Sequence, residues 1–334
     1  MREYAFELAL CAHLESGDGS ASAPGTDGLL ARQLGAACHG SRVMDVVEVV
    51  PGPQFDDRVS LCPGSIPVPV LETDIGPGTA RDPRRALDVH PDRVEGIVDA
   101  AVDAGYLDRE RRDGCDLVRA TGRYPAHWVG RLRGIENKPD LGRPGDLRRQ
   151  LRTDVSLALL DEVVLATASH VTGAHLNRIP DAVGVWRFDP ETGEREVVRE
   201  PTPLDSDGPG VEPLDRRPGR TDIRVVPAAE KRVARRRLAE RAFGKGWRPD
   251  AAAWPDCARV SVGECAGTGP VPDCPWKGRI VDPGSECGPA CGGYEPGTAP
   301  EVDPAAARAD AAPWDPDAGE RRRQAGLGNF GSSE

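Results

Sequence analysis

The stretch HWVGRLRGIENK, residues 127–138, carries the pattern on which the expected fold depends. It predicts a β-strand that Pro139 ends. Side chains alternate between the two faces of a strand, so Glu136 and Lys138 are expected to point to the same side and Asn137 to the other. A carboxylate and an ammonium group are therefore predicted side by side at the end of this strand.

Lys138 is one of only four lysines, although Lys and Arg together number 43. A lysine at this place has two purely structural explanations. It can be a charge that prevents a strand edge from pairing with another chain, or it can form a surface ion pair with Glu136. In this chain either role would ordinarily be filled by arginine. The choice of lysine therefore favours a chemical role over a surface role.

An upstream strand is predicted over RVMDVVEVV, residues 42–50. Asp45 shares a face with Val47 and Val49, while Glu48 lies on the other face. If the two strands are neighbours in one sheet, Asp45 and Glu136 can share a hard cation through oxygen ligands, as Mg²⁺ prefers. Lys138 would then orient a metal-bound water or stabilise charge on a phosphate.

The flanking sequence predicts helices and further strands around this pair. Residues 4–15 and 147–159 have apolar residues at helical spacing, and residues 29–40 are expected to form a short helix. Strands are expected after the second helix, in EVVLATAS (162–169) and in the two halves of VGVWRFDPETGEREVVRE (183–200). The predicted fold class is α/β, a mixed sheet flanked by helices.

The order of these elements resembles the PD-(D/E)xK, or restriction-endonuclease-like, nuclease superfamily. The resembling positions are a helix Glu, a strand Asp, a strand Glu-x-Lys and a helix Gln: Glu7, Asp45, Glu136, Lys138 and Gln150. The resemblance implies a four-stranded mixed core flanked by helices, formed here by residues 1–50 and 127–200. It also implies Mg²⁺-dependent phosphodiester hydrolysis, with metal at the Asp and Glu positions and the Lys assisting the attacking water.

The chain departs from that pattern in three ways. The Asp is not preceded by Pro, and about 90 residues separate it from Glu136 where a direct hairpin is usual. Position 154, which is Tyr in the RecB-like branch, is Asp here. The match therefore requires residues 51–126 to be an insertion. Two short helices, a Gly105 stop and a polar hairpin predict either a winged-helix-like module or an irregular excursion with no separate role.

Residues 201–226 are rich in Pro, Asp and Gly and predict a linker, and residues 227–243 predict a basic helix. Two interpretations of the basic helix stay open. It can track phosphates through Arg232, Arg235 and Arg236, with Trp247 stacking on a base. It can also be a solvated helix that pairs with the protein's own acidic surface.

Residues 227–294 combine this helix with a segment holding five cysteines: Cys257, Cys265, Cys274, Cys287 and Cys291. Thiolates among Gly and Pro with few apolar residues suggest a segment folded by a metal. A zinc site, an iron–sulfur cluster, disulfides and unligated thiols all remain open, because the spacing matches no standard pair of CxxC motifs. Residues 295–334 are expected to be a disordered tail.

The formal charge of −11 and the scarcity of aromatic residues (4%) resemble halophilic archaeal proteins. In strong salt, charge repulsion is screened within about 3 Å at 1 M, so acidity does not exclude a DNA partner. No run of apolar residues predicts a membrane span or a signal peptide, and we expect a cytoplasmic protein. The leading prediction is a Mg²⁺-dependent deoxyribonuclease of repair, recombination or defence. The alternatives are a catalytically silent nucleic-acid-binding or regulatory protein and a metal-folded interaction module.

Overall fold

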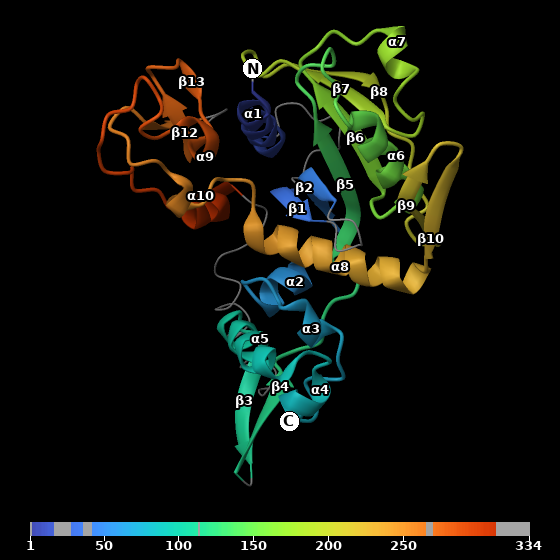
Figure 1. Cartoon of the computed structure of the whole chain (residues 1–334). Coiled ribbons are helices and arrows are strands. Elements are labelled where there is room, and N and C mark those ends of the chain that lie inside the picture. The colour runs from blue at the N-terminus through green and yellow to red at the C-terminus, as the bar shows by residue number, and fades with distance from the viewer. Residues whose placement is uncertain (1, 17–27, 36–41, 113, 265–269, 312–334) are drawn as a thin grey trace, which may run out of the picture.

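A mixed six-stranded sheet forms the centre of the computed structural model, which describes residues 2–16, 28–35, 42–112, 114–264 and 270–311 (Figure 1). The first three strands in spatial order are antiparallel, the next two run parallel to the third, and the last is antiparallel. In spatial order the strands are β1 (Leu29–Gly35), β2 (Val43–Pro51), β5 (Val129–Asn137), β6 (Glu162–Thr167), β7 (Gly184–Phe188) and β8 (Arg195–Arg199).

Helices cover both faces of this sheet because each strand presents apolar side chains to both sides. Helix α1 (Glu3–Ser16) packs Phe6 and Leu10 against one face, together with Ile135 of β5. Helices α6 (Leu147–Leu157) and α8 (Ala228–Lys245) pack against the other face. The short helix α7 (Gly173–Leu176) follows β6. The predicted mixed α/β architecture is confirmed.

Residues 29–35 form strand β1, although a helix was predicted over 29–40. The Leu, Ala, Arg and Gln of this stretch favour helix in isolation, but β1 pairs with β2 from Leu29 opposite Val49 to Gly35 opposite Val43, except at Gln33. Tertiary pairing thus overrides a weak local preference. Residues 36–40 of the predicted helix lie outside the described residues.

Residues 51–126 form the insert between β2 and β5, and it has a hydrophobic core of its own, which includes Ile66, Val98 and Val118. Four helices precede an antiparallel hairpin; the last two and the hairpin match the two helices and the polar hairpin that were predicted, and the first two were not predicted. Arg81 forms an isolated bridge with Val118, beside the hairpin. The elements are α2 (Phe55–Leu61), α3 (Val68–Leu71), α4 (Pro83–Ala86), α5 (Pro91–Asp103), β3 (Leu107–Arg112) and β4 (Cys115–Ala120). Its assignment as a winged-helix-like module stays a prediction.

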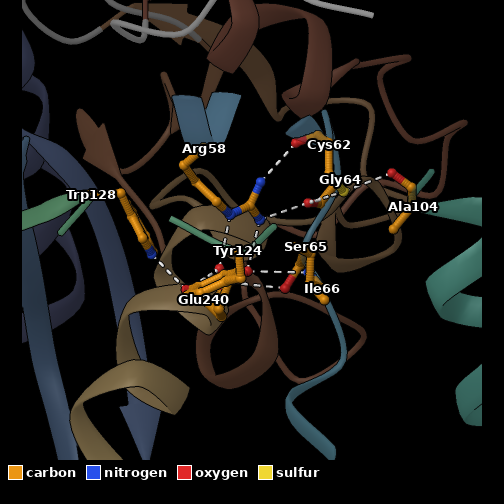
Figure 2. A network of polar contacts seen from close by, with 9 residues as sticks. All are labelled: Arg58, Cys62, Gly64, Ser65, Ile66, Ala104, Tyr124, Trp128 and Glu240. Atoms are coloured by element: carbon orange, nitrogen blue, oxygen red, sulfur yellow. Dashed lines mark hydrogen bonds and ion pairs between the residues drawn. The ribbon is translucent and has the colours of Figure 1, made fainter. Parts of the chain in front are cut away.

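A buried ion pair fixes the insert to helix α8, which lies between the insert and the sheet (Figures 1 and 2). Arg58 of α2 and Glu240 of α8 are both fully buried, and the guanidinium donates two hydrogen bonds of 2.8 and 2.7 Å to the carboxylate. The Tyr124 hydroxyl and the Ile66 N–H also donate to this carboxylate. The remaining N–H groups of Arg58 donate to the carbonyls of Cys62 and Gly64. Every charge in the network therefore has partners, as burial requires.

Residues 210–226 form a hairpin, where the composition predicted a linker. Strand β9 (Gly210–Arg217) pairs with β10 (Arg220–Val226) across Pro218 and Gly219, and Gly219 has a positive φ of 74°. The Pro-Gly pair that suggested a linker forms the two-residue turn of this hairpin. The linker prediction is wrong for this stretch.

The C-terminal part has a small core of its own, which includes Trp254, Cys257 and Cys274. Helix α10 forms where disorder was predicted, and the prediction of disorder is wrong there. Residues 312–334 lie outside the described residues. The elements are the 3₁₀ turn η1 (Ala251–Ala253), β11 (Ser261–Glu264), β12 (Pro270–Cys274), β13 (Arg279–Ile280), α9 (Pro283–Glu286) and α10 (Pro304–Ala311). Of the helices that the structure describes, none is both long and apolar enough to cross a bilayer.

Candidate active site

Strands β2 and β5 are hydrogen-bonded neighbours, so the candidate residues Asp45 and Glu136 lie at the same edge of the sheet. The antiparallel register pairs Val46 with Ile135, which sets Asp45 beside the end of β5. The backbone N–H of Asn137 donates a 2.8 Å hydrogen bond to Oδ2 of Asp45. A cation shared by Asp45 and Glu136 requires the two strands to be neighbours in one sheet. The structure meets this condition.

Asp45 is a half-buried carboxyl that forms no ion pair with the described residues. Burial, followed by the nearby Glu136 carboxylate, raises the pKa of Asp45 to about 7, against the opposing effects of the Asn137 hydrogen bond and the positive charge of Arg42. Glu7 of α1 also acts to raise this pKa. Among the residues that the structure describes, Asp45 forms no ion pair. The site therefore holds more negative charge than its own side chains neutralise.

Glu136 is 6% exposed and shares an arginine with a second buried carboxylate. Nη2 of Arg42 donates to Glu136 at 2.6 Å and to Asp154 of α6 at 2.8 Å, and Nε donates to Asp154 at 3.1 Å. Burial raises the pKa of Glu136 although Arg42 opposes the shift. Sequence reasoning did not name Arg42, because nothing in the sequence separates this arginine from the many others.

Lys138 is the first residue after β5, and its N–H donates to the Ala166 carbonyl of β6 at 2.9 Å. Its ammonium group pairs with Glu3, at the start of α1, and the side chain is 23% exposed. Glu3 is itself largely exposed, at 58%. Lys138 thus lies at the rim of the site, held by a partner that water can replace.

Glu7 is buried on α1 and pairs with two residues of β1, Arg32 and Gln33. Nε of Arg32 donates to one oxygen of Glu7, and the Gln33 amide donates to both at 3.2 and 3.0 Å. Gln33 has a positive φ of 51°, a conformation that costs a residue with a Cβ about 1–2 kcal/mol. This strained residue, which sequence reasoning missed, aims an amide at the site.

Gln150, the remaining predicted site residue, is half-buried on α6. It lies one helical turn before Asp154, so the two side chains share a face of the helix. The structure thus brings together Asp45 and Glu136, with Glu7 near enough to raise the pKa of Asp45, leaves Lys138 at their rim, and adds Arg42 and Asp154. Gln150 stands one turn further out.

The proposed nucleic-acid residues of α8, and Trp247 just after it, lie in different environments. Arg235 forms two hydrogen bonds with Asp161, of 2.9 and 2.8 Å, and Trp247 is 1% exposed with its indole N–H on Glu15. A buried indole cannot stack on a base, so the stacking prediction for Trp247 is wrong. Arg232 is exposed, and with Arg236 it lines a hollow of about 520 Å³.

Four of the five C-terminal cysteines are described, and all four are free thiols: Cys257, Cys274, Cys287 and Cys291. Cys265 lies outside the described residues. Burial raises the pKa of Cys287, and the other three thiols act in the same direction. Over the described part of the chain, no group of three or more His, Cys, Asp or Glu side chains is placed to hold a metal ion. The zinc and iron–sulfur assignments stay predictions.

Two carboxyls, such as Asp45 and Glu136, are nevertheless as many protein ligands as Mg²⁺ commonly takes. Mg²⁺ commonly keeps several waters and takes only one or two carboxylates from a protein, which provide the hard oxygen atoms it prefers. Glu136 and the orphaned Asp45 fit such a donor set. The arrangement can also polarise a phosphate, because Lys138 stands at the rim.

Residues 29–296 match a family of unknown function, DUF5787, and the chain belongs to this family. The matched range contains the whole sheet, the insert and the basic helix, but it begins after Glu7. No curated protein and no solved structure matches the chain.

Proposed function

We propose that this member of the family hydrolyses phosphodiester bonds of DNA with Mg²⁺, at the edge formed by Asp45, Glu136 and Lys138. The observation that carries the proposal is Asp45. A half-buried carboxylate without a cationic partner, beside a second carboxylate, is costly in a protein that does nothing with it. A bound divalent cation removes that cost.

The charges gathered at this edge support a divalent ion. Four carboxylates meet two guanidinium groups, which leaves a surplus of two negative charges when every carboxyl is ionised. The groups are Glu7, Asp45, Glu136 and Asp154 against Arg32 and Arg42. One Mg²⁺ balances this surplus.

In the proposed reaction Asp45 and Glu136 hold the ion, and the Asn137 N–H fixes the orientation of Asp45. The ion, when bound, supplies an activated water and stabilises charge on the phosphate. Lys138 moves from Glu3 to the substrate, at little cost because exposed ion pairs are worth about 0–1 kcal/mol. Its ammonium group then orients the attacking water or neutralises a phosphate oxygen.

The order of the elements gives the proposal a second support. The chain runs from α1 with Glu7 through β2 with Asp45 to β5 with Glu136, and then to α6 with Gln150. This is the order in which the sequence resembles the PD-(D/E)xK superfamily, and the sheet is mixed as that resemblance implies, although it has six strands and not four. The long separation of β2 from β5 is accommodated by the insert.

Arg42 favours a second candidate, a catalytically silent nucleic-acid-binding protein of the same architecture. Its guanidinium already provides Glu136 with a cation at 2.6 Å. If that ion pair is permanent, Glu136 is not free to bind a metal. The two candidates differ in one property, which is whether Mg²⁺ binds at Asp45.

The test is cleavage of supercoiled plasmid DNA with Mg²⁺ at several KCl concentrations, by the wild type, Asp45→Asn, Lys138→Ala and the control Asp140→Asn. Asp140 is exposed and lies two residues from Lys138. We expect cleavage by the wild type and the control, and a loss of at least about a hundredfold in the two site variants, since general acid–base and electrostatic groups contribute roughly 10²–10⁴. Equal rates in all four proteins would refute the assignment. Absent cleavage with retained DNA binding would favour the silent candidate.

A further inference from the structure

The first half of α6 and the loop before it carry four exposed arginines, which we call the α6 arginine surface: Arg143, Arg148, Arg149 and Arg152. Within the described ranges, none of their side chains forms an ion pair or a hydrogen bond. This contrasts with the basic residues of α8, where Arg235 and Arg237 pair with carboxylates and Lys231 and Lys245 donate to carbonyls. Arg232 of α8 is also exposed and has no ion pair among the described residues, so α6 and the loop before it hold the larger group of free arginines.

The α6 arginine surface weakens the helix that carries it. Arg148 and Arg152 are four residues apart, and Arg149 and Arg152 three apart, so like charges face one another at a cost of roughly 0.2–0.5 kcal/mol per pair. Cations near a helix N-terminus also oppose the helix dipole. Helices α1, α2, α5 and α8 each have an acidic residue in the first turn, whereas α6, like α10, has none and carries its acid at the N-cap, Asp146. Stability alone does not account for this charge.

The location of α6 relates these arginines to the candidate active site. The chain leaves β5 at Lys138, passes Arg143 in the loop and enters α6, whose inner face carries Asp154 on the Arg42 bridge to Glu136. Leu147 and Leu151 pack that inner face on the sheet, which leaves the arginines facing outward. Arg143, the first of these arginines, thus follows Lys138 of the candidate site by five residues.

We propose that the α6 arginine surface binds the sugar-phosphate backbone of DNA next to the phosphate that is cleaved. Guanidinium groups bind phosphate oxygens in pairs of parallel hydrogen bonds, so arginine suits this role. The placement of the scissile phosphate rests on the proposed function, but binding of DNA by α6 does not require cleavage. Interactions of this kind carry affinity and position rather than sequence preference.

The test uses two matched variants with four Arg→Gln changes each. One changes Arg143, Arg148, Arg149 and Arg152. The control changes four exposed arginines of the insert that likewise form no ion pair with described residues: Arg84, Arg93, Arg111 and Arg123. Binding of a fluorescein-labelled 30-base-pair duplex is followed by anisotropy in EDTA, at KCl concentrations from about 50 to 200 mM.

The slope of log K against log [KCl] should become shallower by about 0.9 for each phosphate that a variant no longer neutralises. We expect a change of roughly 3–4 in the α6 variant and no change in the insert variant. At about 150 mM KCl the α6 variant should bind at least about tenfold more weakly. Equal slopes in the wild type and the α6 variant, equally weakened binding in both variants, or no binding by the wild type would overturn the proposal. Unchanged circular dichroism and a cooperative melting transition at or above that of the wild type show that the variants are folded.

The nuclease proposal and the α6 proposal would fail on different results. If the wild type binds DNA through the α6 arginines but does not cleave it with Mg²⁺, the α6 proposal stands and the nuclease proposal is refuted. If cleavage depends on Asp45 and the α6 variant has the same KM and salt slope as the wild type, the nuclease proposal stands and the α6 proposal is refuted.

Discussion

The Asn137 N–H donates to Oδ2 of Asp45 at 2.8 Å, across 92 positions of sequence. This bond joins the start of β2 to the end of β5, on either side of the whole insert. It fixes one oxygen of a carboxyl that has no ion-pair partner among the described residues. The candidate site therefore depends on the pairing of two strands that the whole insert separates in the sequence.

Replacing Arg42 by Met should destabilise the protein by about 3–5 kcal/mol, because Asp154 and Glu136 would be left as buried carboxylates without their shared cation. Urea unfolding followed by circular dichroism measures the loss. The matched control is Arg109→Met, which also removes an arginine that bridges two carboxylates, Glu95 and Asp99, but on the surface. We expect the control to lose less than about 1 kcal/mol.

The response of the wild type to Mg²⁺ separates the nuclease from the silent protein. If Glu136 binds Mg²⁺ in place of Arg42, added Mg²⁺ should raise the unfolding free energy of the wild type, since a ligand stabilises the folded state that binds it. If the ion pair between Arg42 and Glu136 is permanent, Mg²⁺ should leave the wild type unchanged, even if it stabilises Arg42→Met, where three carboxylates are left without that arginine.

Replacing Glu240 by Gln should cost about 3–5 kcal/mol, because Arg58 would remain as a fully buried charge without its partner (Figure 2). Arg237→Met on the same helix removes an ion pair with Glu72 that is partly exposed, and should cost less than about 1 kcal/mol. Similar losses of unfolding free energy in the two variants would show that the network does not hold the insert to α8.

The sequence predicted the strands of the site because their apolar residues alternate plainly. Strand β2 was expected at 42–50 and lies at Val43–Pro51, and β5 was expected within 127–138 and lies at Val129–Asn137. Strand β1 was predicted as a helix, since its residues favour helix and only β2 makes them a strand. The local sequence pattern therefore predicted a strand where its alternation was strong, and it failed where pairing with a distant strand determines the structure.

The partners of the site residues were harder to predict for the same reason. Arg42 gains its role only because β2 brings it between Glu136 and Asp154, which lie 94 and 112 positions away. The basic helix α8 attracted attention through its charge density, yet many of its cations are used inside the protein. A count of charges along the chain does not show which of them are free.

The stability contribution of Asp161 should depend on pH. Burial acts to raise the pKa of Asp161, but hydrogen bonds from Arg235, Ser206 and the Leu132 N–H outweigh it, so the net pKa is lowered. A carboxyl with a lowered pKa in the folded state stabilises the protein above its unfolded pKa of about 3.9, and this contribution is lost as the pH falls through the folded pKa.

The expected result is a difference in unfolding free energy between the wild type and Asp161→Asn that is constant from about pH 7 to 5 and shrinks below about pH 4. Urea unfolding at each pH measures it. Asp207→Asn, at an exposed aspartate next to Ser206 in the sequence, serves as the control. A difference that grows as the pH falls would contradict the assignment.

Replacing Asp45 by Asn should stabilise the metal-free protein while it removes the response to Mg²⁺. The amide oxygen can still accept the Asn137 N–H, but the charge that burial and Glu136 oppose is gone. Sites built for function commonly sacrifice stability in this way. In the wild type, Mg²⁺ at about a hundred times its Kd should add about 2.7 kcal/mol to the unfolding free energy, and in Asp45→Asn close to nothing. Thermal unfolding with EDTA and with Mg²⁺ measures both effects, beside Asp140→Asn as the exposed control. An Asp45→Asn protein that is less stable without metal and still gains from Mg²⁺ would place the ion elsewhere.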